Sequence, residues 1–141
     1  MEEFKTMLKR HGLKATRQRL AVHEVMTGLV HASAEMVKEE LYGKGVQVTF
    51  ASVYNILSGL ADHKIYGRRL SATSKMFFDV IPTRHIHLYD RDNHTFRDIA
   101  DEELNMLVAS HLRRRKFRGF SVEDIDIQLI AVPTKSKSKN A

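Results

Sequence analysis

Two histidines stand close together in the second half of the chain. His85 and His87 are two residues apart in a segment predicted to form a β-strand, so their side chains leave the same face of that strand. If the next turn falls at Asp92-Asn93, the returning strand places Asp98 opposite His87. Two imidazoles and one carboxylate would then meet, and these groups are common ligands of divalent transition metals.

Two further residues extend this set of metal ligands. Asp79 ends the preceding strand and can fold back toward the hairpin, and His31 lies in the loop before the third predicted helix. Three imidazoles and two carboxylates suit Fe²⁺, Mn²⁺, Co²⁺, Ni²⁺ or Zn²⁺, whereas Ca²⁺ and Mg²⁺ favour sites made only of oxygen. Histidines of an amphipathic strand are also common as surface or hydrogen-bonded residues. The pattern alone therefore leaves a structural interpretation open.

A second group of residues has the chemistry of DNA recognition. Val53, Ile56, Leu57 and Leu60 have the spacing of a helix that packs on a core, which turns a polar face outward. Hydroxyl, amide and phenol groups on that face suit base edges, and basic side chains before the second helix suit phosphates or a minor groove. The predicted DNA-binding residues are Ser52, Tyr54, Asn55, Lys14, Arg17, Gln18 and Arg19, and Ser58 shares the outward face. A solvated polar helix face is the alternative.

The first half of the chain is predicted to consist of helices followed by a hairpin. Helices are expected near Phe4, after Thr16, after the cap Ser33 and after the cap Thr49. Strands over 65–70 and 76–80 then form a β-hairpin. This order of elements is that of a winged helix-turn-helix, and we assign it to residues 1–82.

A boundary is predicted at Pro82, and a second unit at residues 83–133. It begins with a hairpin of strands over 85–90 and 95–99. A helix that opens at Asp101 and a strand over 120–132 follow. This unit is too small to bury a core alone, so it needs a partner. Residues 134–141, with lysines between serines, are predicted to be a disordered basic tail.

The composition limits the class of protein. Of the 141 residues 43% are hydrophobic and 28% charged, which is typical of a globular protein. The net charge of +6 and the pI of about 9.7 favour a polyanionic partner but also describe a merely basic protein. The chain has no cysteine, which excludes disulfides, thiolate zinc sites and cysteine nucleophiles. With no membrane-spanning run and no signal-peptide core, we expect a cytoplasmic protein without a membrane partner.

No catalytic motif stands out, so we expect the chain not to be an enzyme. A metal-dependent hydrolase is a competing hypothesis, but it requires an open coordination position and a general base. Five protein ligands leave little room for either. A structural DNA-binding protein without a sensor is the third hypothesis.

Several segments resemble the ferric uptake regulator (Fur) family in order and spacing. They are Gly12–Arg19 (GLKATRQR), His31–Glu35 (HASAE), Ala51–Leu57 (ASVYNIL), Phe78-Asp79 and His85–Leu88, within a resemblance from about Gly12 to Val132. The resemblance implies an α+β fold, in which an N-terminal winged helix-turn-helix DNA-binding domain precedes a small α/β dimerisation domain. It also implies that Lys14 enters a minor groove and that Tyr54 and Asn55 meet bases, although family members often have arginine at position 55.

The resemblance also implies the metal site. His31, Asp79, His85, His87 and Asp98 fall on the positions of the family's regulatory site, which implies one divalent transition metal per subunit. Fe²⁺ or Mn²⁺ is favoured, and Zn²⁺ is an alternative. Aspartate at positions 79 and 98 resembles the peroxide-responsive (PerR-like) branch, in which bound Fe²⁺ reacts with peroxide. The lack of cysteine and the Phe77-Phe78-Asp79 stretch resemble the Irr-like branch, in which haem binding matters, although Ile86 interrupts that branch's run of histidines.

Two departures from the family pattern remove other metal sites. Where most members have a Cys-x-x-Cys pair for a structural zinc, this chain has Asp90 and Asn93, so we expect no structural zinc held by four cysteines. The family's additional site aligns with Arg84, Ile86, Asn105 and Ile125, and these side chains cannot assemble it.

The leading hypothesis is thus a metal-responsive transcription regulator of this family, with repression as the favoured mode. It would control iron or peroxide-stress genes, and a haem-responsive Irr-like iron regulator is the alternative. Metal would set the angle between the two domains and so the spacing of the recognition helices. The predicted partners are a second copy in a homodimer and double-stranded DNA with a palindromic operator.

Overall fold

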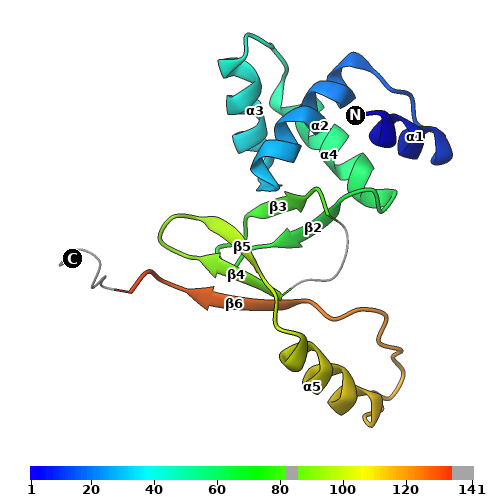
Figure 1. Cartoon of the computed structure of the whole chain (residues 1–141), viewed down its shortest axis with the longest axis vertical. Helices are drawn as coiled ribbons and strands as arrows, with labels where there is room; N and C mark the ends of the chain where they lie inside the picture. Colours follow the sequence, from blue (N-terminus) through cyan, green and yellow to red (C-terminus); the bar gives the residue numbers. More distant parts are fainter. Residues whose placement is uncertain (82–85, 135–141) are drawn as a thin grey trace. The chain divides into compact units, whose positions relative to one another are not determined.

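The structure is a computed structural model and describes residues 1–81 and 86–134 (Figure 1). It separates into unit 1, residues 1–83, and unit 2, residues 84–141. Helices and small sheets make up both units, and the fold class is α+β, as predicted. Pro82, His85 and nearly all of the predicted tail lie outside the described residues.

The described part of unit 1 contains four helices and three strands. They are α1 (Glu2–Arg10), α2 (Arg17–Leu29), β1 (His31–Ala32), α3 (Ala34–Gly43), α4 (Phe50–Asp62), β2 (Gly67–Leu70) and β3 (Met76–Asp79). Apart from β1, this order is the one predicted from the sequence. Among the described residues of the whole chain, no helix is long and apolar enough to span a bilayer.

Side-chain caps fix where the helices of unit 1 begin. The hydroxyl oxygens of Thr16, Ser33 and Thr49 accept hydrogen bonds from backbone N–H groups in the first turns of α2, α3 and α4. Each cap satisfies an N–H group that has no partner within its own helix. The starts predicted at Ser33 and Thr49 are confirmed. The start of α4 determines which of its side chains face outward.

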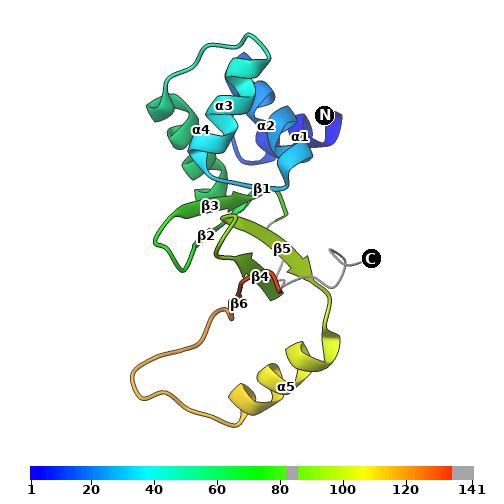
Figure 2. The same cartoon turned by 90° about the vertical axis from the view of Figure 1, so that its left-hand side faces the viewer.

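The core of unit 1 lies between its helices and its sheet. The helices occupy one side of that sheet, as the two views show (Figures 1 and 2). Val53, Leu57 and Leu60 of α4 are buried, and Phe78 of β3 joins the same cluster with no exposed surface. Ile56 is half-buried and lies at the edge of this core. The predicted apolar face of α4 is therefore the face that packs.

Strand β1 was not predicted from the sequence. It follows Val30, whose φ of +66° is unusual for a β-branched residue and turns the chain out of the end of α2. β1 pairs with β3 in antiparallel register, so that His31 faces Asp79 and Ala32 faces Phe78. With the β2–β3 hairpin it gives a three-stranded sheet in the order β1-β3-β2.

The described part of unit 2 contains β4 (Ile86–Asp90), β5 (Thr95–Ile99), α5 (Glu102–Arg113) and β6 (Ile127–Ala131). β4 is the middle strand of its sheet, antiparallel to β5 and parallel to β6.

The strand predicted over 120–132 is too long. Gly119, with φ +83°, lies in a turn that bridges Phe117 and Phe120, and pairing with β4 begins only at Ile127. Phe120 and Val122 are 81% and 53% exposed, so apolar residues before β6 do not belong to a buried strand.

Unit 2 buries little apolar surface within one chain. α5 has no buried residue, and Met106 and Leu107 on it are 65% and 61% exposed. Ile130 of β6 is 57% exposed. Exposed apolar side chains on a helix and a strand of one small unit mark a surface that association would cover.

A histidine fixes α1 to the rest of unit 1. The ring of Phe4 stacks on that of His23 at 3.6 Å between centroids, and Nδ1 of His23 lies 2.7 Å from the hydroxyl oxygen of Tyr66. Burial lowers the pKa of His23 from 6.5 to about 4, and the N-terminal ammonium group adds to this effect. The folded chain therefore holds this imidazole neutral at pH values where the unfolded chain protonates it.

We expect His23 to make unit 1 less stable in mild acid. Above pH 6.5 the ring is neutral in both states, whereas between pH 6.5 and about 4 the unfolded state binds the extra proton. The free energy of unfolding should therefore decrease as the pH is lowered from 6.5 to about 4, and it should decrease less steeply in His23→Gln. Urea unfolding at pH 7 and pH 5 measures the difference. His63→Gln, which alters an exposed histidine at the end of α4, is the control and should keep the wild-type slope. Equal slopes in all three proteins would contradict the prediction.

Candidate metal-binding and DNA-binding residues

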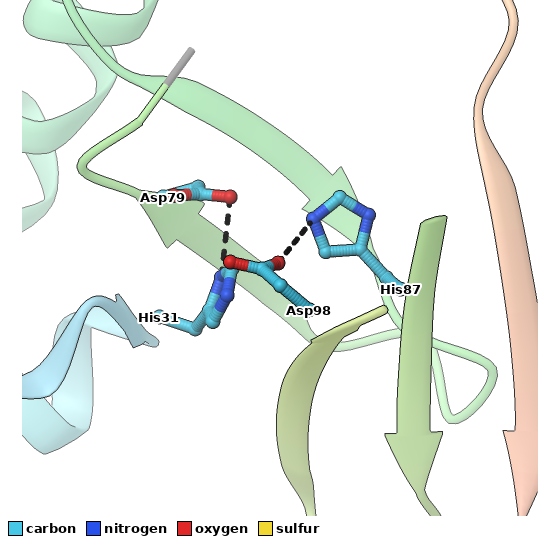
Figure 3. A group of neighbouring side chains, drawn as sticks. All are labelled: His31, Asp79, His87 and Asp98. Carbon is cyan, nitrogen blue, oxygen red and sulfur yellow. Dashed lines mark ion pairs between the residues drawn. The ribbon is translucent and has the colours of Figure 1, made fainter. Parts of the chain in front are cut away.

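The first predicted pair of ligands lies within unit 1. Because β1 pairs with β3, His31 is the direct cross-strand partner of Asp79. Nδ1 of His31 lies 3.2 Å from Oδ2 of Asp79 (Figure 3). Both residues are buried, and the other carboxylate oxygen of Asp79 accepts a hydrogen bond of 2.8 Å from the backbone N–H of Ile81. The carboxylate is thus held with one oxygen toward the imidazole.

The second pair lies within unit 2 and repeats the arrangement. His87 of β4 is the cross-strand partner of Asp98 of β5, which is the register that the sequence predicted from a turn at Asp92-Asn93. Nε2 of His87 lies 3.2 Å from Oδ1 of Asp98 (Figure 3). The side chain of His87 is fully buried, and that of Asp98 is 31% exposed. The ring of Phe96 meets the His87 ring edge-on at 6.0 Å.

The donor chemistry of both pairs fits a divalent transition metal. Each residue offers one ligand atom, an imidazole nitrogen or a carboxylate oxygen. The structure thus describes four of the five predicted ligands as two His–Asp pairs, one in each unit. The fifth, His85, lies outside the described residues. Without a metal, each pair is an ion pair only when its histidine carries a proton.

The hairpin between β4 and β5 closes through its own side chains. The carboxylate of Asp90 accepts hydrogen bonds from the backbone N–H groups of Asp92 and Asn93 and from the Asn93 amide, the last at 2.8 Å. The bond from the Asn93 side chain is the main reason that the pKa of Asp90 lies below 3.8. His94 adopts a φ of +55°, and its Nδ1 lies 2.9 Å from the hydroxyl oxygen of Tyr89. Asp90 and Asn93, which make the first of these contacts, occupy the positions at which the family pattern has its cysteine pair.

Two of the positions that align with the family's additional metal site have a different environment here, and Arg84 lies outside the described residues. Asn105 and Ile125 line a cavity of about 330 Å³ beside α5, together with Met106, Ala109 and Arg113 among others. No described residue that lines this cavity is a histidine or an acid. The cavity therefore offers a divalent metal neither an imidazole nor a carboxylate.

The predicted base-reading residues differ in their exposure. Asn55 is exposed on α4, and Ser52 is half-buried beside the capping hydroxyl of Thr49. Tyr54 was expected to point away from the core, but its half-buried ring meets that of Phe78 edge-on at 5.9 Å. The Oγ of Ser58 is buried, so the expectation that Ser58 faces outward is wrong.

The residues before α2 also divide into two kinds. Lys14, Arg17 and Gln18 are exposed. Arg19 is half-buried, and its guanidinium donates a hydrogen bond of 2.8 Å to the backbone carbonyl of Lys14. Arg19 therefore holds the loop that presents Lys14.

A groove brings residues of α2 and α4 together. Gln18 and Ser52 line a space of about 520 Å³ with residues of α3 and of the loop before α4. Two predicted DNA-binding residues that are far apart in the sequence thus share one face of unit 1.

One neighbour of the second pair was missed by sequence reasoning. Oδ1 of Asp126, just before β6, lies 3.9 Å from Nδ1 of His87. The alternation Asp124, Asp126, Gln128 could have indicated that these side chains share a face, but β6 could not be paired with β4 from the sequence.

Comparisons of the sequence with known families and proteins give consistent results. The model of the "Ferric uptake regulator family" matches residues 10–130. The ferric uptake regulation protein of Klebsiella pneumoniae is 29% identical over 109 residues, which cover 75% of this chain and 70% of that protein.

Solved structures with the same fold include three metalloregulators. The Vibrio cholerae ferric uptake regulator has a TM-score of 0.79 at 23% identity, and the alignment covers 92% of this chain and 98% of the Vibrio cholerae chain. The Pseudomonas aeruginosa ferric uptake regulator with manganese has a TM-score of 0.73 at 24% identity, with coverage of 93% and 98%. A zinc-bound manganese uptake regulator has a TM-score of 0.73 at 20% identity, with coverage of 92% and 98%. At these identities the similarity establishes the fold.

We expect the Asp90 side chain to hold the β4–β5 turn. Asp90→Ala removes the acceptor of three hydrogen bonds, so the amide protons of β4 and β5 should exchange faster with solvent, as measured by hydrogen exchange at pH 7. Because the folded pKa is lowered, the contribution of Asp90 is present above its unfolded pKa and is lost as the pH falls below 3.8. Asp92→Ala removes the same charge from the same turn and is the control. Equal exchange in the two variants would show that the Asp90 contacts do not hold the turn.

Proposed function

The chain belongs to the ferric uptake regulator family, since the family model matches residues 10–130, and we propose that it represses iron or peroxide-stress genes in response to one divalent metal per subunit. Members of this family are metal-responsive transcription regulators that bind DNA as dimers, and they are not enzymes. The chain is accordingly a metal-responsive transcription regulator. We further propose that this regulator acts in the cytoplasm.

The observation that carries the proposal is the pair of His–Asp contacts, in which both histidines and Asp79 are buried. We place the metal at His31, Asp79, His87 and Asp98, with His85 as a further predicted ligand. The donor set of imidazole and carboxylate favours Fe²⁺ or Mn²⁺, with Zn²⁺ as the alternative. The Pseudomonas aeruginosa relative was solved with manganese and another relative with zinc, so similar folds accept both ions.

The division of the ligands between the two units suggests how the metal controls DNA binding. His31 and Asp79 would hold the metal from unit 1, and His87 and Asp98 from unit 2. Bringing two carboxylates to one place without a cation is unfavourable, so the joined arrangement depends on the ion. A metal that binds one arrangement of the units more tightly than the others shifts the population toward it. The spacing of the two α4 helices in a dimer then changes with metal supply.

The DNA-binding residues would act in two ways. Lys14, Arg17 and Gln18 would contact phosphates or the minor groove, with Arg19 holding the Lys14 loop. Ser52, Tyr54 and Asn55 would meet base edges in the major groove. Through the exposed apolar residues of α5 and β6, unit 2 would form the homodimer, and a two-fold dimer reads a palindromic operator.

Peroxide and haem remain alternatives as the physiological signal. Aspartate at positions 79 and 98 is the sequence feature that favours a peroxide response, and the Phe77-Phe78-Asp79 stretch is the one that favours haem. Peroxide sensing through Fe²⁺ would leave added oxygen on His31 or His85 after exposure to peroxide, which mass spectrometry detects. Haem binding would give a visible absorption band on titration.

We expect metal to raise operator affinity through the two His–Asp pairs. With an operator selected from a random duplex library, Mn²⁺ should strengthen wild-type binding by roughly 5- to 150-fold, the usual range for coupling between two sites. His31→Ala and His87→Ala should each lose most of this gain, because each leaves the metal with one unit's ligands incomplete. Fluorescence anisotropy at fixed ionic strength measures the affinities. His63→Ala, at the exposed end of α4, is the control and should respond as the wild type does. A full metal response in His87→Ala would contradict the proposed site.

We expect Lys14 and Asn55 to differ in the kind of DNA contact they make. Lys14→Ala should weaken binding to all sequences and reduce the slope of log affinity against log salt by about one, because a positive charge that neutralises phosphates, either directly or from within the minor groove, is lost. Asn55→Ala should leave that slope unchanged. It should reduce the difference in binding free energy between the preferred and the other bases at one position by about 1–3 kcal/mol. Lys9→Ala removes the same charge from α1 and controls for net charge. If Lys9→Ala changes the slope as much as Lys14→Ala, the assignment of Lys14 is wrong.

A further inference from the structure

We propose that Asp126 is a positioning residue for His87, and that its carboxylate accepts a hydrogen bond from Nδ1–H of that ring when Nε2 serves as a metal ligand. The inference rests on the proposed metal site, and it adds a residue outside the predicted set of ligands. Asp126 would act through His87 and would not touch the metal itself.

The sheet of unit 2 places a carboxylate on each side of His87. β4 is the middle strand, so β5 supplies Asp98 on one side at 3.2 Å from Nε2. On the other side β6 runs parallel to β4, and Gln128 is the register partner of His87. Asp126 comes two residues before Gln128 and therefore shares its face, with Oδ1 at 3.9 Å from Nδ1 of His87. The two ring nitrogens of one imidazole thus face two different carboxylates.

The orientation of this ring is restricted by burial. The His87 side chain has no exposed surface, and the Phe96 ring lies against its edge. Nε2 is therefore directed toward Asp98, and Nδ1 toward Asp126. The distance of 3.9 Å exceeds that of a hydrogen bond. Since the Asp126 side chain is 53% exposed, it has room to rotate and close the gap.

Metal binding would turn Nδ1 into a hydrogen-bond donor. A neutral imidazole carries one proton, so a ring that gives the lone pair of Nε2 to a metal keeps its proton on Nδ1. A carboxylate that accepts a hydrogen bond from this N–H group fixes the tautomer and makes Nε2 a better ligand. Loss of such a partner typically lowers metal affinity by about 10- to 100-fold.

The test measures Zn²⁺ binding to the whole 141-residue chain by competition with a chromophoric chelator at pH 7. Zn²⁺ is chosen because it is diamagnetic and leaves the ring signals visible by NMR. Asp126→Ala should bind Zn²⁺ about 10- to 100-fold more weakly than the wild type. Asp126→Asn should lose less, because its amide oxygen still accepts a hydrogen bond. In the Zn²⁺-loaded protein the Nδ1 proton of His87 should exchange slowly in the wild type and faster in Asp126→Ala.

The matched control is Asp124→Ala. It removes the same charge from the same segment, but the Asp124 carboxylate accepts a hydrogen bond from the Ile125 backbone instead. It should bind Zn²⁺ as the wild type does. If Asp126→Ala does not fold, Asp126→Val also lacks an acceptor and suits the start of a strand.

The outcomes separate this inference from the proposed function. Wild-type affinity and an unchanged Nδ1 proton signal in Asp126→Ala or Asp126→Val would overturn the inference and leave the metal site standing. An equal loss in Asp124→Ala would also overturn it, because the effect would then be one of net charge. Failure of the wild type to bind Zn²⁺, Mn²⁺ or Fe²⁺ would overturn the proposed function first.

Discussion

A strand register that places a histidine opposite an aspartate is the constraint on which both units depend. In unit 1 the register of β1 with β3 is fixed by the core, because Ala32 and its partner Phe78 are fully buried next to His31 and Asp79. Successive residues of a strand point to opposite faces, so a slip of β1 by one residue would turn Ala32 away from the core and separate His31 from Asp79. Apolar packing thus selects the geometry of the polar pair. The fold itself therefore holds His31 and Asp79 side by side.

The two registers differ in how far the sequence could predict them. The pairing of His87 with Asp98 followed from a local turn at Asp92-Asn93, whose side-chain chemistry is legible in the sequence. β1 could not be predicted, because a strand of two residues carries no periodicity and its partner β3 is distant in the chain. The positions of Asp79 and His31 in the chain suggested that each could reach the metal site, but their direct pairing within one sheet was not predicted. The strand predicted to begin at Phe120 was too long for another reason. An apolar sequence pattern indicates which residues tend to be buried, but it does not show whether they are buried within the same chain or exposed on its surface, as Phe120 is.

The predicted DNA-binding face shows a similar limit. Tyr54 and Arg19 were assigned from their polar groups, yet each also has a structural contact within unit 1. Tyrosine and arginine commonly bury the body of the side chain and present a polar tip, so residue type alone does not separate the two roles. Lys14 depends on this arrangement, since the Arg19 guanidinium bonds to its carbonyl. The exposed residues that are predicted to contact DNA and the half-buried ones that hold them in place therefore form one group.

Phe78 connects the predicted metal-binding and DNA-binding residues within unit 1. It precedes Asp79 in β3, it is fully buried, and its ring meets that of Tyr54 on α4. Because protein interiors are closely packed, a shift of β3 at Asp79 cannot be absorbed by empty space beside Phe78. The Tyr54 ring must adjust to any such shift, and Tyr54 lies in the helix assigned to base reading. Contact through a single aromatic ring therefore joins the His31–Asp79 pair to the predicted DNA-reading surface, independently of how the two units are arranged.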